Sequence, residues 1–347
     1  GSAADAYALE AWLAQVQEEM FQELGLVLPT VRSEADDPRL APEEFRIRVH
    51  GVELGPRTGL APDEFLAGDS PERLKLIGLP ESRRCPNPAS GAEHAVLPLE
   101  ASSVPTCQAW GVPTWGPVGF LALALVAELR KSAARLQTDT LVAFLLESLR
   151  DWYPTLVERA LERYPLPRLA GVLRALLQEE VSVRDLRGIL EGLLAVNGTT
   201  DADSSRFILF TAPSDNLYPS AQADEPVRLT NEQLADAVRV TRHRYLSHRY
   251  TRGQSSLTVL LLDPAVEQRI VASGARPLTL EEREQLWSAV EAEYKGPHAA
   301  NVVILTDLQI RRALRSLLKP RFPGLPVLAY QELSPTLNIQ PVARISL

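Results

Sequence analysis

Cysteine is scarce in this chain of 347 residues, which has only Cys85 and Cys107. Two cysteines cannot build the disulfide framework of a small secreted protein, and their separation does not fit the ligand spacing of a zinc site. Long apolar runs are lacking too, because no stretch approaches the roughly 18 apolar residues of a membrane-spanning helix. We therefore expect reduced thiols in a cytosolic chain. The opening Gly1-Ser2 resembles a cloning scar, so the chain is expected to be a fragment of a longer protein.

Motifs for catalysis are also lacking. The sequence contains no HExxH, no GxxxxGK[ST], no dinucleotide-binding glycine pattern and no GxSxG. His243 and His248 are five residues apart, so they do not share a helical face as a metal-binding pair would. We expect no enzyme activity, no metal and no cofactor. A catalytic site could arise only from residues that are distant in sequence.

The net charge of −8 argues against a general nucleic-acid or anionic-membrane partner. One segment departs from this acidic balance. Residues 242–252 read RHRYLSHRYTR, a basic run with interleaved tyrosines. Such a composition can bind nucleic acid, so a nucleic-acid-binding helical module is the alternative function. The favoured interpretation is a helix surface that faces an acidic neighbour, with no nucleic acid bound.

Periodicity predicts a mixed α+β chain. An amphipathic helix ends at Gly25, a half-buried strand covers 45–49, and Val52 begins a partner strand. Residues 69–113 are punctuated by proline and are expected to form a small, mostly extended insertion. Helices follow from Pro117, including one over 231–250 that is capped by Thr230 or Asn231, with Gln233 nearby. Beyond Arg252, strands at 257–262, 301–305, 325–329 and 338–345 alternate with helices, which predicts an α/β layer.

The clearest pattern lies in Leu166–Val196, which predicts two amphipathic helices joined by a short break. Ser182 is expected to cap the second helix, with Asp185 completing an acidic variant of the capping box. Arg184 and Arg187 would then lie near the start of that helix, where cations oppose the helix dipole. They are either part of a solvated polar face or have acidic partners on another element or subunit. Glu191, four residues after Arg187, offsets part of this cost.

The segment LLQEEVSVRDLRGILEGLLA (176–195) resembles the FlhA/SctV export-gate family of type III secretion. The family pattern is approximately LL-x-E-x-(V/I)-x-I-R-(D/N)-x-R-x-I-L-E-x-L, with Val183 standing here for the isoleucine. Other stretches are similar in the same order, and together they cover nearly all of the chain: Glu18–Gly25, Phe45–Glu53, Gly111–Leu149, Leu325–Leu333 and Asn338–Ile339.

The resemblance implies the cytosolic domain of a bacterial inner-membrane protein, attached to the membrane only through a missing N-terminal part. It implies a ferredoxin-like α/β subdomain with a small inserted subdomain, a helical bundle subdomain and a C-terminal α/β subdomain. The expected boundaries are 1–68 and 114–137 for the first subdomain, 69–113 for the second, 138–252 for the third with an insertion at 197–228, and 253–347 for the fourth. The implied partners are further copies in a nine-membered ring, chaperone–substrate complexes, a gatekeeper protein and the export ATPase stalk.

Two sets of residues are expected to mediate these contacts. Ring contacts are assigned to Arg184, Asp185, Arg187 and Glu191. A chaperone or substrate groove is assigned to Ile77 and Leu79, with Leu123 on the opposite wall. Flagellar members carry D-P-A-F-G-L in this groove, whereas this chain has LKLIGL at 74–79 and leucine in place of their threonine at 123. The difference favours a virulence system, in which the chain docks its partners without catalysis.

Overall fold

The computed structural model describes residues 3–346 except 35–36, 42, 80–82, 90, 92, 101, 197–228, 273–277 and 295–301. The predicted insertion at 197–228 therefore lies outside the described residues. The chain forms two compact units, Gly1–Leu145 with Leu169–Asp185, and Leu146–Arg168 with Leu186–Leu347. None of the described helices combines the length and the apolar character needed to cross a bilayer. Both cysteines are free, as predicted.

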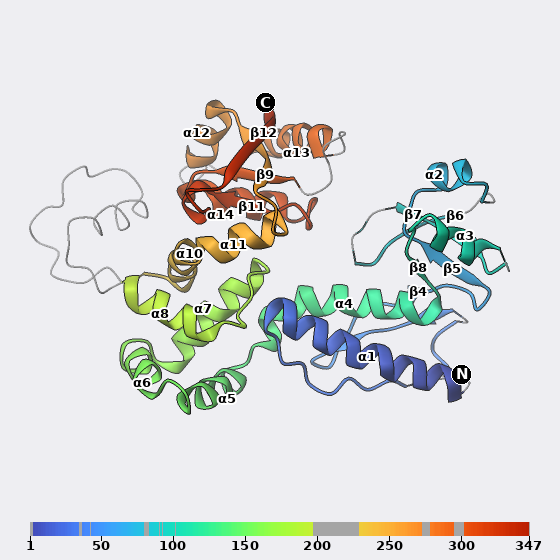
Figure 1. Ribbon diagram of the computed structural model, residues 1–347, viewed down its shortest axis with the longest axis horizontal. Helices are drawn as coiled ribbons and strands as arrows, with labels where there is room; N and C mark the ends of the chain where they lie inside the picture. Colours follow the sequence, from blue (N-terminus) through green and yellow to red (C-terminus); the bar gives the residue numbers. More distant parts are fainter. Residues whose placement is uncertain are drawn as a thin grey trace, which may run out of the picture. The chain divides into compact units, whose positions relative to one another are not determined.

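Two long helices pack together in the first unit (Figure 1). α1 (Ala3–Leu24) buries Met20 and Leu24, and α4 (Pro117–Leu136) starts at a proline that occupies a first-turn position. Arg130 of α4 donates a hydrogen bond of 2.8 Å to the Glu23 carboxylate of α1. Apolar burial and this ion pair together fix the α1–α4 contact.

A four-stranded antiparallel sheet forms the second part of this unit, in the order β6-β7-β5-β8. Its strands are β5 (Glu64–Ala67), β6 (Arg83–Pro86), β7 (Glu93–Pro98) and β8 (Thr114–Trp115). Side chains alternate between its faces, so Phe65 and Ala67 enter one apolar cluster while Leu66 enters another. Gly68 permits the close return of the chain, because a Cβ there would lie 2.5 Å from the Pro113 ring.

Two predictions for this unit need correction. The expectation of a mostly extended insertion over 69–113 is wrong in part, because α2 (Pro71–Leu76) and α3 (Ser103–Ala109) lie within it. The predicted strand over 45–49 is broken into β1 (Glu44–Phe45) and β2 (Arg48–Val49), which pair with different partners. β1 pairs with β4 (Arg57–Thr58), and β2 pairs with β3 (Val52–Glu53). The predicted partner strand at Val52 is therefore confirmed.

Helices dominate the middle of the chain. α5 (Asp139–Arg150) and α7 (Leu166–Gln178) each run from one unit into the other, and α6 (Pro154–Arg163) lies in the second unit. α8 (Leu186–Val196) contacts α6 and α10 (Asn231–Thr241). The Tyr164 hydroxyl donates to the Leu193 carbonyl at 3.1 Å, and Gly192 allows close approach because its Cβ would lie 2.6 Å from Thr241 Oγ1.

The predicted cap at Thr230 is confirmed as a capping box with Gln233. The single helix predicted over 231–250 is instead two helices, α10 and α11 (His243–Thr251), which are separated at Arg242. No glycine or proline lies at this break, so no local sequence signal marks it.

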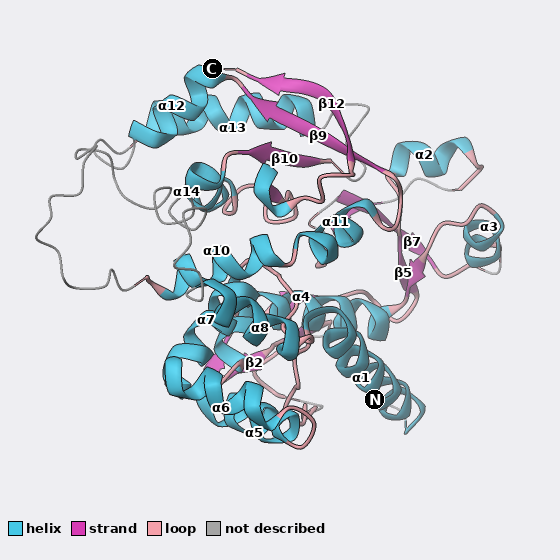
Figure 2. Cartoon of the chain, turned by 60° about the vertical axis from the view of Figure 1, so that its left-hand side comes forward, coloured by secondary structure: helices cyan, strands magenta, loops and turns pink. Residues whose placement is uncertain are grey.

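The predicted α/β layer is present as a parallel sheet in the order β11-β10-β9-β12. Figure 2 labels three of its strands, β10, β9 and β12. Its strands are β9 (Ser256–Leu262), β10 (Val303–Thr306), β11 (Val327–Ala329) and β12 (Asn338–Ile345). Pro341, which cannot donate a backbone hydrogen bond, lies in the edge strand β12 beside a register shift.

Helices cover both faces of this sheet. α12 (Pro264–Ala272), α13 (Leu280–Tyr294) and α14 (Leu308–Leu318) share one apolar cluster with Leu260 and Ile304. The other face carries Val259 and Leu305, against which Tyr250 of α11 packs. α11 is therefore anchored on the sheet by its apolar side.

Buried charges also join the helical region to the sheet region within the second unit. Arg239 of α10 donates two hydrogen bonds, of 2.6 and 2.8 Å, to Glu332 of the 3-10 helix η1 (Tyr330–Glu332). Arg311 of α14 lies 3.1 Å from the same carboxylate and also pairs with Asp236. Arg239 is 2% exposed and Glu332 is 0% exposed. The two buried arginines are thus each paired with a carboxylate of the protein.

Candidate interaction surfaces

The loop before α8 is held against the end of α1. The Val183 N–H donates to the Leu24 carbonyl at 2.9 Å, and Val181 and Val183 are buried. Gly25 has φ of +72°, and a Cβ there would lie only 2.2 Å from the Arg184 nitrogen. A residue without a side chain is required for this contact.

The predicted ring residues are all exposed, but two of them do not lie in the helix. α8 begins at Leu186, so Arg184 and Asp185 precede it. The prediction that Ser182 caps α8 is wrong, because α8 begins only at Leu186. The Ser182 hydroxyl accepts from the Arg184 N–H at 3.3 Å within the loop. Asp185 occupies the position next to the first helical residue, where aspartate is favoured. The expected dipole penalty therefore does not apply to Arg184.

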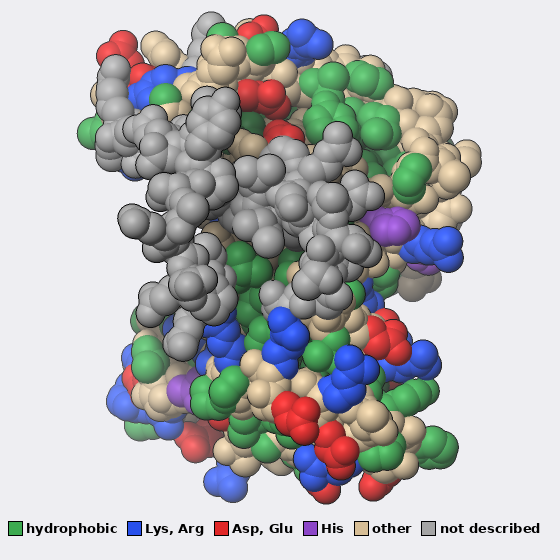
Figure 3. All heavy atoms as spheres, turned by 90° about the vertical axis from the view of Figure 1, so that its left-hand side faces the viewer, with side chains coloured by type: hydrophobic (Ala, Val, Ile, Leu, Met, Phe, Trp, Pro, Cys, Tyr) green, Lys and Arg blue, Asp and Glu red, His purple; other side chains and the backbone are tan. Residues whose placement is uncertain are grey.

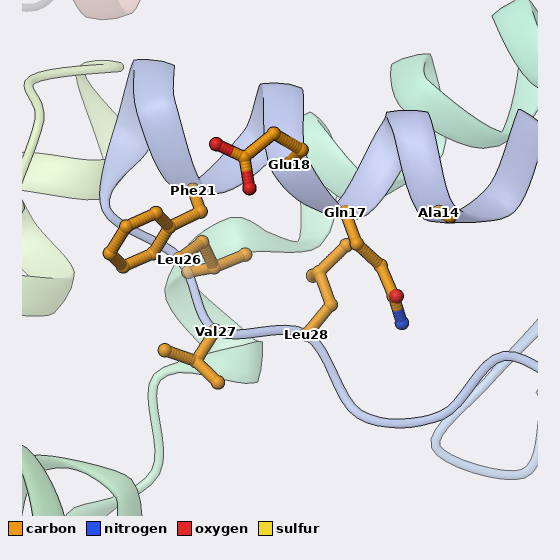
Figure 4. A pocket seen from close by; sticks show the side chains of 7 residues that line it. All are labelled: Ala14, Gln17, Glu18, Phe21, Leu26, Val27 and Leu28. Atoms are coloured by element: carbon orange, nitrogen blue, oxygen red, sulfur yellow. The ribbon is translucent and has the colours of Figure 1, made fainter.

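Arg184 lies above an aromatic ring of α1, with its guanidinium carbon 5.7 Å from the Phe21 centroid. Phe21 is 38% exposed and forms one wall of a hollow of about 310 Å³ (Figure 4). The remaining lining comes from α1 and the segment that follows it: Ala14, Gln17, Glu18, Leu26, Val27 and Leu28. The lining combines apolar side chains with the Glu18 carboxylate and the Gln17 amide.

Arg187 is fixed by three contacts within the second unit. It donates to Glu191 at 2.8 Å and to the Tyr153 hydroxyl at 3.1 Å, and it lies 4.8 Å from the Tyr153 centroid. The hydrogen bond to Glu191 is the main reason that the pKa of Arg187 is raised. Next to Tyr153, Trp152 is 81% exposed. Arginine, tyrosine and tryptophan are the residue types that are enriched in interface hot spots.

The predicted groove residues do not lie together. Ile77 and the buried Leu79 belong to the apolar cluster on one face of the β6-β7-β5-β8 sheet. Leu123 packs against the cluster on the opposite face. The structure therefore does not bring Leu123 to Ile77 and Leu79, and their shared role stays a prediction.

Sequence reasoning missed several exposed apolar residues. Trp152 and Tyr153 lie between α5 and α6, and Phe21 lies on the outer side of α1. In the predicted insertion, Leu76 is 86% exposed and Trp110 is 66% exposed. For Phe21 and Leu76, an apolar residue off the core-facing stripe of its helix is the sequence signal that could have identified them. Among the described residues, no group of three or more His, Cys, Asp or Glu side chains could hold a metal ion.

Comparison with sequence families gives a clear match. The model of the FHIPEP family matches residues 2–209 and 221–338. The hypersensitivity response secretion protein HrcV of Ralstonia nicotianae is 27% identical over 99% of this chain and 46% of its own length. The flagellar biosynthesis protein FlhA of Bacillus subtilis is also 27% identical, over 96% of this chain and 46% of its own length. The chain thus spans less than half the length of these relatives.

Solved structures share the fold. A complex of Chlamydia pneumoniae CdsV and CdsO contains a chain with a TM-score of 0.77 and 23% identity, covering 97% of this chain and 90% of its own. The nonameric SctV-C of EPEC has a TM-score of 0.71 and 18% identity, covering 99% of this chain and 95% of its own. Both likenesses extend over nearly the whole chain. The predicted α+β multi-subdomain fold class and the family resemblance are therefore confirmed.

Proposed function

Because this chain belongs to the FHIPEP family, we propose that it is the cytosolic, ring-forming domain of a type III secretion export gate. Its role is to dock partner proteins for export, and it performs no catalysis. The protein that contains it lies in the bacterial inner membrane, with this domain in the cytoplasm. The fold shared with nonameric SctV-C supports a ring of nine copies.

The observation that carries the ring proposal is the exposed cluster of Trp152, Tyr153, Arg187 and Glu191 in the second unit. Tyr153 and Glu191 hold the Arg187 guanidinium in place before a partner arrives, so little side-chain entropy is lost on association. Trp152 supplies apolar area that water covers in the single chain. Arg184 and Asp185, exposed on the first unit, are further predicted contacts.

Sedimentation velocity and electron microscopy at high protein concentration test this proposal. Trp152→Ala and Arg187→Glu are expected to shift the chain toward monomer. Loss of a hot-spot side chain costs about 2 kcal/mol or more, which corresponds to about thirtyfold in dissociation constant. Arg344→Glu, an equal charge reversal on an exposed residue of β12, is the matched control and is expected to leave assembly unchanged. Equal behaviour of the three variants would contradict the assignment.

We propose further that partners dock on the inserted part of the first unit. Candidates are chaperone–substrate complexes, a gatekeeper protein and the export ATPase stalk; the CdsV and CdsO complex is a solved assembly of a chain with this fold. Of the predicted groove residues, Ile77 and Leu79 lie in this inserted part, whereas Leu123 of α4 packs on the opposite face of the sheet. The exposed Leu76 and Trp110 add apolar surface to the inserted part.

A virulence system is favoured over a flagellar one. The support is the stretch 74–79, which lacks the aromatic and the acidic residue of flagellar members. The equal identities to HrcV and FlhA favour neither system. Binding of purified injectisome-type and flagellar-type export chaperones to this chain, measured by calorimetry, distinguishes the two.

A further inference from the structure

A row of basic side chains runs along one side of α11. Arg244, His248 and Arg252 follow one another at intervals of four residues, and all three are exposed. Residues four apart lie on the same helical face, about 6 Å apart along the axis. Arg252 closes the helix as its C-cap, with φ of +53°. We call these three residues the α11 basic row.

The α11 basic row has no acidic partner within the described part of the chain, in contrast to many other arginines. Neither α11 nor the flanking residues 242 and 252 include an aspartate or glutamate. No carboxylate of the described residues forms an ion pair with Arg244, His248 or Arg252. Several other arginines do have an acidic partner, such as Arg187 with Glu191, Arg269 with Glu282 and Arg321 with Glu291. Among the coloured side chains of Figure 3, basic and acidic residues likewise lie interspersed.

Helix stability explains only part of this row. Cations near a helix C-terminus interact favourably with the helix dipole, which accounts for Arg252. Arg244 lies in the first turn, where the dipole disfavours a cation and where α11 has no acidic residue. Helix stability therefore does not explain the position of Arg244.

The neighbouring tyrosines decide between two kinds of anion. Nucleic acid without a fixed sequence is usually held by aromatic rings on which bases stack. Here the guanidinium of Arg242 lies 4.8 Å from the Tyr245 centroid, and that of Arg249 lies 5.8 Å from the Tyr250 centroid. Tyr250 also packs against the sheet. Both rings already contact a guanidinium of the chain, so they do not offer the open stacking surface that bases use.

We propose that the α11 basic row binds an acidic polypeptide segment of a partner protein. A helix with glutamates at i, i+4 and i+8 presents carboxylates at the same spacing of about 6 Å. Buried Leu246 and Ser247 fix the opposite side of α11, and Ser247 accepts from the Ser334 N–H at 2.8 Å. The row is thus held on a rigid support. This surface is separate from the proposed ring cluster and does not depend on it.

The experiment uses the whole chain and a fluorescein-labelled, alanine-rich helical peptide with glutamates at i, i+4 and i+8. Fluorescence anisotropy at low ionic strength measures binding, and a peptide with glutamines in those positions is the probe control. The test variant is R244Q/R252Q. The matched variant is R32Q/R159Q, which removes the same charge from two other exposed arginines. Circular dichroism verifies that both variants fold.

We expect the acidic peptide to bind the wild-type chain, and its affinity to fall by about tenfold or more in R244Q/R252Q, with binding also lost as salt rises. The R32Q/R159Q variant should bind as the wild type does. Three outcomes would overturn the proposal. These are no binding of the peptide, an equal loss in both variants, and tighter binding of a double-stranded oligonucleotide that R244Q/R252Q abolishes. A changed sedimentation coefficient of R244Q/R252Q without peptide would instead assign the row to contacts between copies.

Discussion

Replacing Gly25 with alanine tests how the loop before α8 is positioned. Gly25 ends α1 with φ of +72°, and a Cβ there would meet the Arg184 nitrogen at 2.2 Å and its Cα at 2.5 Å. Both contacts are to backbone atoms, which cannot rotate away. The loop would have to move, and the hydrogen bond from the Val183 N–H to the Leu24 carbonyl would lengthen or break.

Gly51 provides the matched control, because its φ is +77° but nothing lies within 4 Å of its Cβ position. Gly51→Ala should cost only the left-handed strain of about 1–2 kcal/mol. Gly25→Ala should cost that strain plus about 1–3 kcal/mol for overpacking. Loss of the hydrogen bond adds about 1 kcal/mol. The two variants should therefore differ by about 2–4 kcal/mol.

Urea unfolding of both variants gives the difference in stability, and hydrogen exchange at the Val183 amide gives a local measure. Exchange at Val183 should accelerate in Gly25→Ala and stay unchanged in Gly51→Ala. Equal unfolding free energies, together with unchanged exchange at Val183, would refute the claim that Gly25 sets the position of Arg184.

Two further predictions concern charges in the second unit. Glu332→Gln leaves Arg239 buried without a carboxylate and should lower the unfolding free energy by about 3–5 kcal/mol. Urea unfolding measures this loss, with Glu281→Gln at an exposed position as the control. Similar losses of unfolding free energy in the two variants would count against a buried ion pair. Hydrogen bonds from Arg269, and then from the Thr279 N–H, lower the pKa of Glu282 from 4.5 to about 2. Because the folded-state pKa is depressed, this stabilisation is present above about pH 4.5 and is lost as the pH falls toward 2. Arg269→Gln should return the Glu282 pKa toward 4.5 in an NMR titration, and an unchanged pKa would exclude the ion pair as its cause.

Local patterns predicted well where one face of an element is buried. The strand over 338–345 matches β12, and the cap at Thr230 matches a capping box, because both depend on residues within a few positions. The same reasoning placed Arg184 in a helix that starts only at Leu186. The loop at 181–185 is instead held by α1, which is far away in sequence and leaves no local signal.

The sequence indicated which of the predicted ring residues are exposed, but not which side chains contact them. Arg184, Asp185, Arg187 and Glu191 are exposed, as an interface requires, although their role is untested. Nothing in the sequence indicated that Tyr153 would hold Arg187 across 34 positions. Exposure follows from helical periodicity, whereas such a partner depends on how two helices pack.

The sequence by itself determined the local elements, the mixed α+β class and the family pattern of 176–195, because periodicity, capping and side-chain order act over short distances. The tertiary structure alone decided which of these residues meet. It placed Ile77 and Leu79 on one face of a sheet and Leu123 on the other, since the strands between them alternate their side chains. It also joined Arg239 to Glu332 across 93 positions. Both side chains are buried away from solvent, so each charge needs an oppositely charged partner, and no short-range sequence pattern encodes that partner.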